Sequence, residues 1–268
     1  MPALDTIASF QATVGSTFAA GVMATGDSAQ VRNFPQPGVA QLVSAMSDHV
    51  TSAQAWRVRS PLLHDNVQGI RFFAGQSPSA TLLPRQAQQN LEAQDLLVFE
   101  QSTAAATGKA LTALGIYYPQ LPGAMARLYS LGDIDPLIKN VKPVVVTIGA
   151  GANTAGQWLD TLITATENLL HANTDYAVLG IVVDTPVACV AVKGIDTGNL
   201  RCGVPGVLNA DVTSDWFVRL SVAAGLPLIP VINAANAPAT FVSIISSAAT
   251  AAACDAQLIL AELSRNLS

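Results

Sequence analysis

The sequence predicts a mainly β protein made of two tandem antiparallel sandwiches, and three observations lead to this prediction. The 268 residues are 50% hydrophobic and only 12% charged, whereas an ordinary globular domain carries about 25% charged residues. Short apolar runs of strand length are separated by Gly, Pro, Asn and Asp, the residues that favour turns. Segments of the first half also match segments of the second half in the same order, which predicts an internal duplication.

One set of matches relates the two halves at an offset of 146 residues. Residues 82–101 match residues 228–247 without a gap, and residues 109–118 match residues 255–264 at the same offset. In the first pair, leucine, proline, asparagine and alanine recur at equivalent positions. Two long matches in the same order are difficult to obtain by chance, so they favour a common origin for the two halves.

A second set of matches has a shorter offset. Residues 41–58 match residues 161–178 at an offset of 120 residues. The difference between the two offsets predicts an insertion of about 26 residues in the second copy. We expect this insertion near residues 194–215, as a loop that stands out from the second sandwich.

The first copy is expected to begin with an irregular arm over residues 1–30 and to fold as a sandwich over residues 31–140. Apolar residues spaced by three and four positions between Val39 and Val50 predict one amphipathic helix. The remaining short runs read as strands, with proline at several of their edges. The expected strands are 55–59, 67–74, 80–86, 94–101 and 109–118.

The second copy is expected to occupy residues 141–268 and to follow the same plan. Its amphipathic helix is predicted between Trp158 and Leu170, where the same apolar spacing occurs. Its expected strands are 176–183, 187–193, 215–222, 227–232, 239–246 and 255–263. Strands at this spacing, with few helices between them, predict an antiparallel sandwich or barrel in each half.

A glycine-rich turn at 149–156 supports an alternative function, a nucleotide-binding enzyme. It follows an apolar run and precedes the predicted helix, as a phosphate-binding turn would. Gly149 and Gly151 fill the first two glycine positions of the dinucleotide motif, but Thr154 occupies the third. Asp184, a candidate ribose ligand, lies 35 residues beyond Gly149, farther than the usual spacing of about 20 residues.

Other catalytic patterns are not evident, so we expect no catalytic residues, no cofactor and no metal site. The histidines His49, His64 and His171 have none of the neighbours that metal-binding motifs require. Asp133 and Asp135 are interpreted as a helix cap and a turn residue rather than as an acid and base pair.

Charge, the length of apolar runs and the cysteines argue against several further classes of protein. The net charge is −5 and no basic cluster occurs, so direct sequence-specific binding of nucleic acid is not expected. No apolar stretch reaches the roughly 18 residues of a membrane-spanning helix, and the first residues do not predict a secretory signal. The three cysteines, Cys189, Cys202 and Cys254, are expected to be buried free thiols in strands, which fits a reducing compartment.

This overall plan resembles the double jelly-roll major capsid proteins of tailless icosahedral viruses, above all the small ones of lipid-containing bacteriophages. The resemblance lies in two tandem sandwiches over residues 30–268, with little charge and no catalytic pattern. The most similar segments are 173–184, 196–206 and 216–236. The resemblance implies that each sandwich is a jelly roll and that the chain is a structural protein of a virion rather than an enzyme.

Membership of such a family would imply a homotrimer whose six sandwiches imitate a hexagon and tile an icosahedral shell. The implied partners are other copies of this chain, neighbouring trimers, a vertex protein and an internal lipid membrane, with assembly in the host cytoplasm. Burial of surface between copies would account for the low charge. A different oligomeric β protein, such as a tail, fibre, adhesin or carbohydrate-binding module, remains an alternative; 6% aromatic content disfavours carbohydrate binding.

Overall fold

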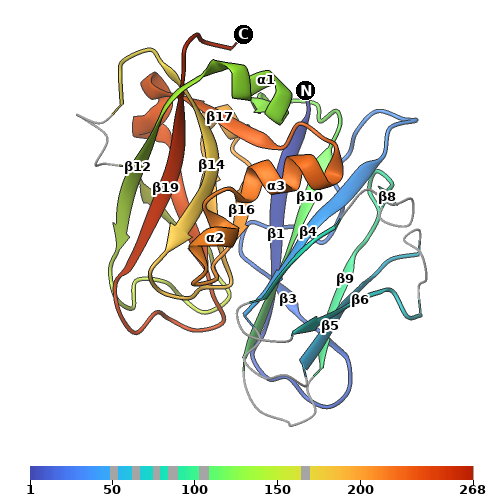
Figure 1. The fold of residues 1–268 in the computed structure, drawn as a ribbon. Coiled ribbons are helices and arrows are strands. Elements are labelled where there is room, and N and C mark those ends of the chain that lie inside the picture. Colours follow the sequence, from blue (N-terminus) through green and yellow to red (C-terminus); the bar gives the residue numbers. More distant parts are fainter. Residues whose placement is uncertain are drawn as a thin grey trace.

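The protein is mainly β, with several antiparallel sheets, as the sequence predicts. The computed structural model describes residues 1–48, 54–61, 67–74, 79–83, 90–102, 109–163 and 170–267. The described strands form four sheets, two in each half of the chain, and the halves lie side by side (Figure 1). We call residues 3–118 the first sandwich and residues 128–263 the second sandwich.

The first sandwich consists of two antiparallel sheets. Its strands in chain order are β1 (Ala3–Gln11), β2 (Ala19–Ala20), β3 (Val22–Met23), β4 (Ala40–Ser47), β5 (Gln54–Arg59), β6 (Ile70–Ala74), β7 (Ser79–Leu82), β8 (Asn90–Leu91), β9 (Val98–Ser102) and β10 (Ala110–Tyr118). One sheet has the order β3-β1-β10-β4-β7, with β8 also paired to β4, and the other has the order β2-β9-β5-β6.

The second sandwich also consists of two sheets, and helices occur mainly in this half. Its strands are β11 (Leu128–Tyr129), β12 (Ile138–Ile148), β13 (Leu159–Leu162), β14 (Asp175–Val183), β15 (Cys189–Lys193), β16 (Cys202–Pro205), β17 (Ile229–Asn233), β18 (Phe241–Ile245) and β19 (Cys254–Leu263). The sheets have the orders β11-β17-β14-β19-β12 and β13-β18-β15-β16. The helical segments are α1 (Leu131–Ile134), η2 (Asp135–Leu137), η3 (Ile195–Thr197), α2 (Ala210–Thr213), α3 (Trp216–Ala224) and η4 (Ala234–Ala239).

Eight strands of each half follow the same spatial order. We number them one to eight along the chain, as β1, β2, β4, β5, β6, β8, β9 and β10 in the first sandwich and as β12 to β19 in the second. In both halves one sheet then places strand one beside strand eight, followed by strands three and six. The other sheet places strand two beside strand seven, followed by strands four and five.

A β-bulge also occurs at the same place in both halves. Where β10 pairs with β4, four residue pairs precede a shift at which Val43 is skipped. Where β19 pairs with β14, four residue pairs precede a shift at which Leu179 is skipped. A bulge adds one residue to one strand and bends the sheet locally. The third and eighth strands of both sandwiches are therefore bent at equivalent points.

The central strands are buried on both faces. All eight residues of β4 and all nine of β10 are buried. One large cluster of buried apolar residues contains side chains from both sandwiches, among them Trp56, Leu114 and Trp216. α3 lies between the halves in Figure 1 and contacts β14, β17 and β4, so it covers an outer sheet face that water would otherwise reach.

The prediction of an irregular arm over residues 1–30 is wrong for residues 3–11. Residues 3–11 form β1, which pairs along its whole length with β10 and is buried from Ala3 to Ser9. Thr6 and Ile7 are the β-branched residues of this strand, and the small or polar residues around them give a weak local strand signal. Strand pairing with a segment about 100 residues away decides its structure.

The two predicted accessory helices are also wrong over the described residues. Residues 40–47 form strand β4 and residues 159–162 form strand β13. The apolar spacing in 39–50 fits a helix because β4 is buried on both faces. Its apolar residues Leu42, Val43, Ala45 and Met46 therefore do not alternate with polar ones as they would in a strand buried on one face. Residues 164–169, where the second helix would continue, lie outside the described residues, as do residues 49 and 50.

Conversely, the strand predicted at 215–222 is a helix. α3 buries Trp216, Phe217, Leu220, Ser221 and Ala224, a spacing of one helical face. Gly225, with a φ of 65°, ends the helix in the left-handed conformation that glycine adopts readily. The segment 194–215 is no projecting loop either, because it contains β16, a buried strand paired with β15.

The match between residues 41–58 and 161–178 is not supported by the fold. Residues 40–47 form the central strand β4, whereas residues 159–162 form β13 at the edge of the other sheet. The shared bulge makes β14 the counterpart of β4 instead. The insertion inferred from the shorter offset therefore loses its basis.

Candidate assembly surfaces and the joint between the sandwiches

The two sandwiches meet where β1 of the first lies against β16 of the second. The amide of Thr6 donates a hydrogen bond to the carbonyl oxygen of Arg201 at 2.8 Å. The amide of Gly203 donates to the hydroxyl oxygen of Thr6 at 2.9 Å. A side chain at position 203 would overlap Thr6, so the close approach of the strands requires glycine there.

A buried carboxylate lies beside this contact. Asp27 accepts hydrogen bonds from the amide of Ala8 at 2.8 Å and from Nε1 of Trp158 at 2.9 Å. Arg201 lies 3.4 Å from its other carboxylate oxygen and 4.8 Å from the centre of the Trp158 ring. The tryptophan and the arginine belong to the second sandwich, so Asp27 links the two halves through both.

Desolvation dominates the ionisation of Asp27. Burial raises its pKa to about 6, although the hydrogen bonds from Trp158 and Ala8 and the charge of Arg201 all act to lower it. The carboxylate therefore titrates at the acidic edge of the physiological range. Protonation would weaken its attraction to Arg201, so the charge balance at this joint depends on pH.

The network continues into the second sandwich. Asp160 on β13 accepts hydrogen bonds from Lys193 and from the hydroxyl of Ser243, both at 2.6 Å, and lies 3.5 Å from Arg201. Despite partial burial, these hydrogen bonds and cations keep the pKa of Asp160 below its usual value. Asp160 therefore stays ionised when Asp27 is protonated.

A second buried pair fixes the connection between the sandwiches. Arg127, which precedes β11, forms a two-pronged contact with Asp175 on β14, with the shorter distance at 2.5 Å. Asp175 is fully buried and also accepts bonds from the amide of Leu267 and the side chain of Asn233. These bonds lower the pKa of Asp175. The connecting segment and the last residues of the chain are thus held to the same strand.

Among the described strands that end their sheets, β6 and β12 are the two considered as surfaces for another chain. β6 ends one sheet of the first sandwich, and β12 ends one sheet of the second. β12 is 11 residues long and exposes Val141 and Val145. A long edge with exposed apolar side chains is a site for pairing with another chain. These edges are the candidate assembly surfaces.

The glycine-rich segment 149–156 is a turn between two strands. The amide of Gly151 donates to Thr250, and the amide of Gly156 donates to Ser246, so neither is available to a phosphate. Asn153 exchanges hydrogen bonds with Ala248 and Thr250. The chain then enters strand β13 rather than a helix. The geometry of a dinucleotide-binding turn, with glycines before a helix N-terminus, is therefore not present here.

The other residues singled out from the sequence have structural roles where they are described. Asp133 accepts bonds from the amide and hydroxyl of Ser130, which lower its pKa and cap α1, and Asp135 opens η2. His171 contacts Glu262 at 3.1 Å. His49 and His64 lie outside the described residues.

The cysteines are free and buried, as expected from the sequence. Cys189, Cys202 and Cys254 lie on β15, β16 and β19. Burial raises the pKa of all three thiols, that of Cys254 to about 11. Across the described ranges, no cluster of His, Cys, Asp and Glu has the arrangement of a metal site.

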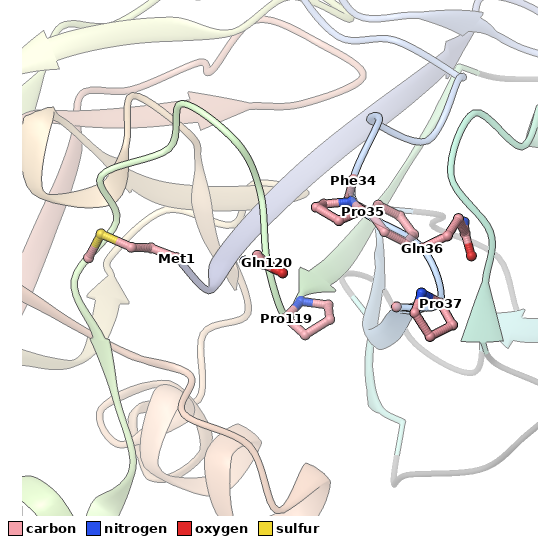
Figure 2. A pocket seen from close by; sticks show the side chains of 8 residues that line it. Met1, Phe34, Pro35, Gln36, Pro37, Pro119 and Gln120 are labelled. Atoms are coloured by element: carbon pink, nitrogen blue, oxygen red, sulfur yellow. The ribbon is translucent and has the colours of Figure 1, made fainter.

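A shallow hollow of about 380 Å³ lies near the start of β1. Figure 2 shows the segment Phe34–Pro37 facing Pro119 and Gln120 across it, with Met1 at its far side. Among the described residues, three prolines and no charged side chain line this hollow. These side chains provide no group for acid–base or nucleophilic chemistry. In the part of the chain that the structure describes, no helix has both the length and the apolar character to cross a membrane.

The network around Asp27 could not be found in the sequence. Trp158 and Arg201 lie 131 and 174 residues along the chain from Asp27. No local motif contains them, and only the pairing of the two sandwiches brings them together. The one local signal is the tryptophan that follows the glycine-rich turn. A tryptophan at such a position is as typical of an ordinary apolar core as of a polar network.

Two solved structures show a weak overall similarity to this chain. The exported protein XepA of PBSX has 7% sequence identity and a TM-score of 0.26, over 97% of this chain and 86% of that protein. The major capsid protein P2 of bacteriophage PM2 has 12% identity and a TM-score of 0.26, over 99% of both chains. No protein-family model and no curated protein matches the sequence. Similarity at this TM-score supports no conclusion about function, so the function is inferred from the geometry of this chain.

Proposed function

We propose that this chain is a double jelly-roll capsid protein that forms the trimeric building block of an icosahedral shell. The observation that carries the proposal is the repeated strand order. Strands one, eight, three and six in one sheet and two, seven, four and five in the other are the order of a jelly roll, a fold common among viral capsid proteins. The bulge at equivalent points of both sandwiches supports their origin by duplication.

Two similar sandwiches in one chain allow three chains to imitate a hexagon. Each chain contributes two corners, so a trimer with threefold symmetry presents six nearly equivalent sandwiches. Such an object fits six-coordinated positions of a shell lattice. The proposal also accounts for the scarcity of charge, because surface between chains would be covered in the assembly.

The role is structural rather than catalytic. The described polar clusters are paired internally, as at Asp27, Asp160 and Asp175, and they join segments of the chain to one another. Location in a virion after assembly in a host cytoplasm, and contacts with a vertex protein or a lipid membrane, are parts of the same proposal.

Sizing of the purified protein tests the proposal. Light scattering should give a mass of three chains or of a complete shell, and electron microscopy should show hexagonal tiles or closed particles. A protein that remains a monomer at high concentration, over a range of salt and pH, would contradict the proposed function.

A further inference from the structure

We propose that β12 of one chain and β6 of the next form the joint between chains in the trimer. This joint has the same form as the joint within the chain. It joins the second sandwich of one chain to the first sandwich of the next through the corresponding strands. The inference rests on the proposed function, because it requires a ring of like subunits. Beyond the proposed trimer, the inference specifies which two surfaces of neighbouring chains meet and the order in which the chains follow one another around the ring.

The joint within the chain is the template. Strand one of the first sandwich, β1, contacts strand five of the second sandwich, β16, through the bonds of Thr6 with Arg201 and Gly203. If the rotation that relates the first sandwich to the second is applied again, strand one of the second sandwich must meet strand five of the next first sandwich. Those strands are β12 and β6.

Both of these strands are at the ends of their sheets. β12 is the last strand in the order β11-β17-β14-β19-β12, and β6 is the last in β2-β9-β5-β6. They lie on opposite flanks of the molecule, β12 at the left and β6 at the lower right of Figure 1. Two different surfaces that bind each other give a head-to-tail contact, which closes into a ring when the rotation permits.

The charges near β6 and at the far end of β12 are opposite in sign, whereas the start of β12 carries Lys139 and Lys142 beside Glu262. On the face near β6, the described charged residues include Arg57, Arg59 and Arg71 and the carboxylate of Glu100. Arg57 and Arg71 both lie over the ring of Phe18, at 4.3 and 5.3 Å from its centre, which fixes them on this face. Among the described residues at the β6 edge, the cationic groups therefore outnumber the carboxylate.

The end of β12 is acidic. Thr147 on β12 donates a hydrogen bond to Asp255 at 2.6 Å, and the amide of Asp255 donates to Asp184 at 2.8 Å. Neither carboxylate forms an ion pair with a described residue. Opposite charges on two surfaces steer their association and select the partner. A second copy of this chain brings the cationic β6 edge to this acidic end.

One difference between the two joints is built into β12. The bulge and the pairing of first with eighth strands make Pro143 the counterpart of Thr6. Proline has no amide hydrogen, so the bond that Thr6 donates to Arg201 cannot recur between chains. Proline on an edge also prevents uncontrolled addition of strands. The joint between chains thus depends more on side chains than the joint within the chain.

Cross-linking of two exposed valines tests the inference. Val67 precedes β6 and Val145 lies on β12; their exposed fractions are 75% and 41%. We would prepare Val67→Cys, Val145→Cys and the double variant, and treat each with a short bis-maleimide before a denaturing gel. The native thiols are buried and should not react. Leu208→Cys, exposed and on neither strand, is the matched control.

A head-to-tail ring predicts a specific pattern of products. Each single variant should stay monomeric on the gel, a mixture of the two should give only dimers, and the double variant should stop at three chains. Dimers from one single variant would indicate a twofold contact and overturn the inference. Products beyond three chains from the double variant would overturn the closed ring.

Charge reversal provides a second, independent test. Arg71→Glu should raise the concentration at which half of the protein is trimeric by about tenfold. Because the dissociation constant of a trimer varies with the square of this concentration, the change corresponds to about 2.8 kcal/mol per trimer. Arg219→Glu, on the exposed face of α3, should leave that concentration unchanged. An unchanged concentration for Arg71→Glu would contradict the inference.

The two levels of proposal fail separately. A trimer by light scattering that gives no product from mixed single variants would reject the β6–β12 joint and leave the proposed function standing. A protein that is monomeric before any substitution would reject the proposed function, and the joint with it.

Discussion

Asp27 shows how a single buried side chain can contribute to the pH dependence of stability. It lies between the sandwiches, with bonds to Ala8 and Trp158 on one oxygen and Arg201 near the other. Its raised pKa means that the folded state holds the proton more tightly than the unfolded chain does. The stabilising effect of this group is therefore fully present below about pH 4 and is lost as the pH rises through about 6.

Asp27→Asn tests this behaviour. The difference in the free energy of unfolding, wild type minus variant, should fall by about 3 kcal/mol between pH 4 and pH 7. An asparagine oxygen can still accept from Ala8 and Trp158, so the variant should fold. Urea titrations of both proteins across this range provide the measurement, and a difference that does not vary with pH would refute the assignment.

At the scale of elements, the bulge in β14 places Gly180 directly beneath the segment that leads to α3. A methyl group at this position would overlap the carbonyl oxygen of Thr213 and the backbone of Ser214. Helix and strand are therefore in backbone contact, and the absence of a side chain at Gly180 permits that approach.

Gly180→Ala should lower the free energy of unfolding by about 1–3 kcal/mol, because the helical segment must move away from the sheet. Gly149→Ala is the matched control, since nothing lies within 4 Å of an added methyl group there. Thermal unfolding of both variants gives the comparison. Equal stability of the two would show that the contact at Gly180 is easily relaxed.

The elements differ in how far the sequence predicts them. The strand runs that end at Tyr118 and Val183 are predicted nearly to the residue, because apolar side chains and turn residues bound them clearly. The segment around Val43 fits a helical pattern although it is a strand, because both faces of that strand are buried. Trp216 and Leu220 fit a predicted strand, although their spacing of four is helical.

The candidate assembly surfaces are harder to predict from the sequence than the helices and strands. The low charge raises the question of surface covered by other chains, but it does not say which surface. Edge strands are defined by which strands fail to pair, and pairing between Ile148 and Cys254 or between Gln11 and Ala110 spans more than 90 residues. Local patterns do not encode such distances.

At the scale of the whole molecule, the joint makes the two sandwiches one cooperative unit. Buried bonds at Thr6 and Asp27 cross between them, and a shared cluster of apolar side chains spans both. Opening the joint would expose a partly buried arginine and a buried carboxylate at the same time. Such a contact favours unfolding of both halves together.

Calorimetry should accordingly show a single unfolding transition for the wild type. Trp158→Ala removes the ring beneath Arg201 and the bond to Asp27, so it should separate the transition into two or broaden it measurably. Two resolved transitions in the unmodified protein would contradict a cooperative joint.

The adjacency of β1 with β10, and of β12 with β19, has a consequence for how such a chain could arise. In each sandwich, the first and the last of the eight equivalent strands are neighbours in one sheet. A unit whose two ends emerge side by side can be copied end to end in a gene without cutting through either sheet. The same arrangement delays completion of this sheet during synthesis, because the first strand of each sandwich cannot pair with the eighth strand until the eighth has left the ribosome.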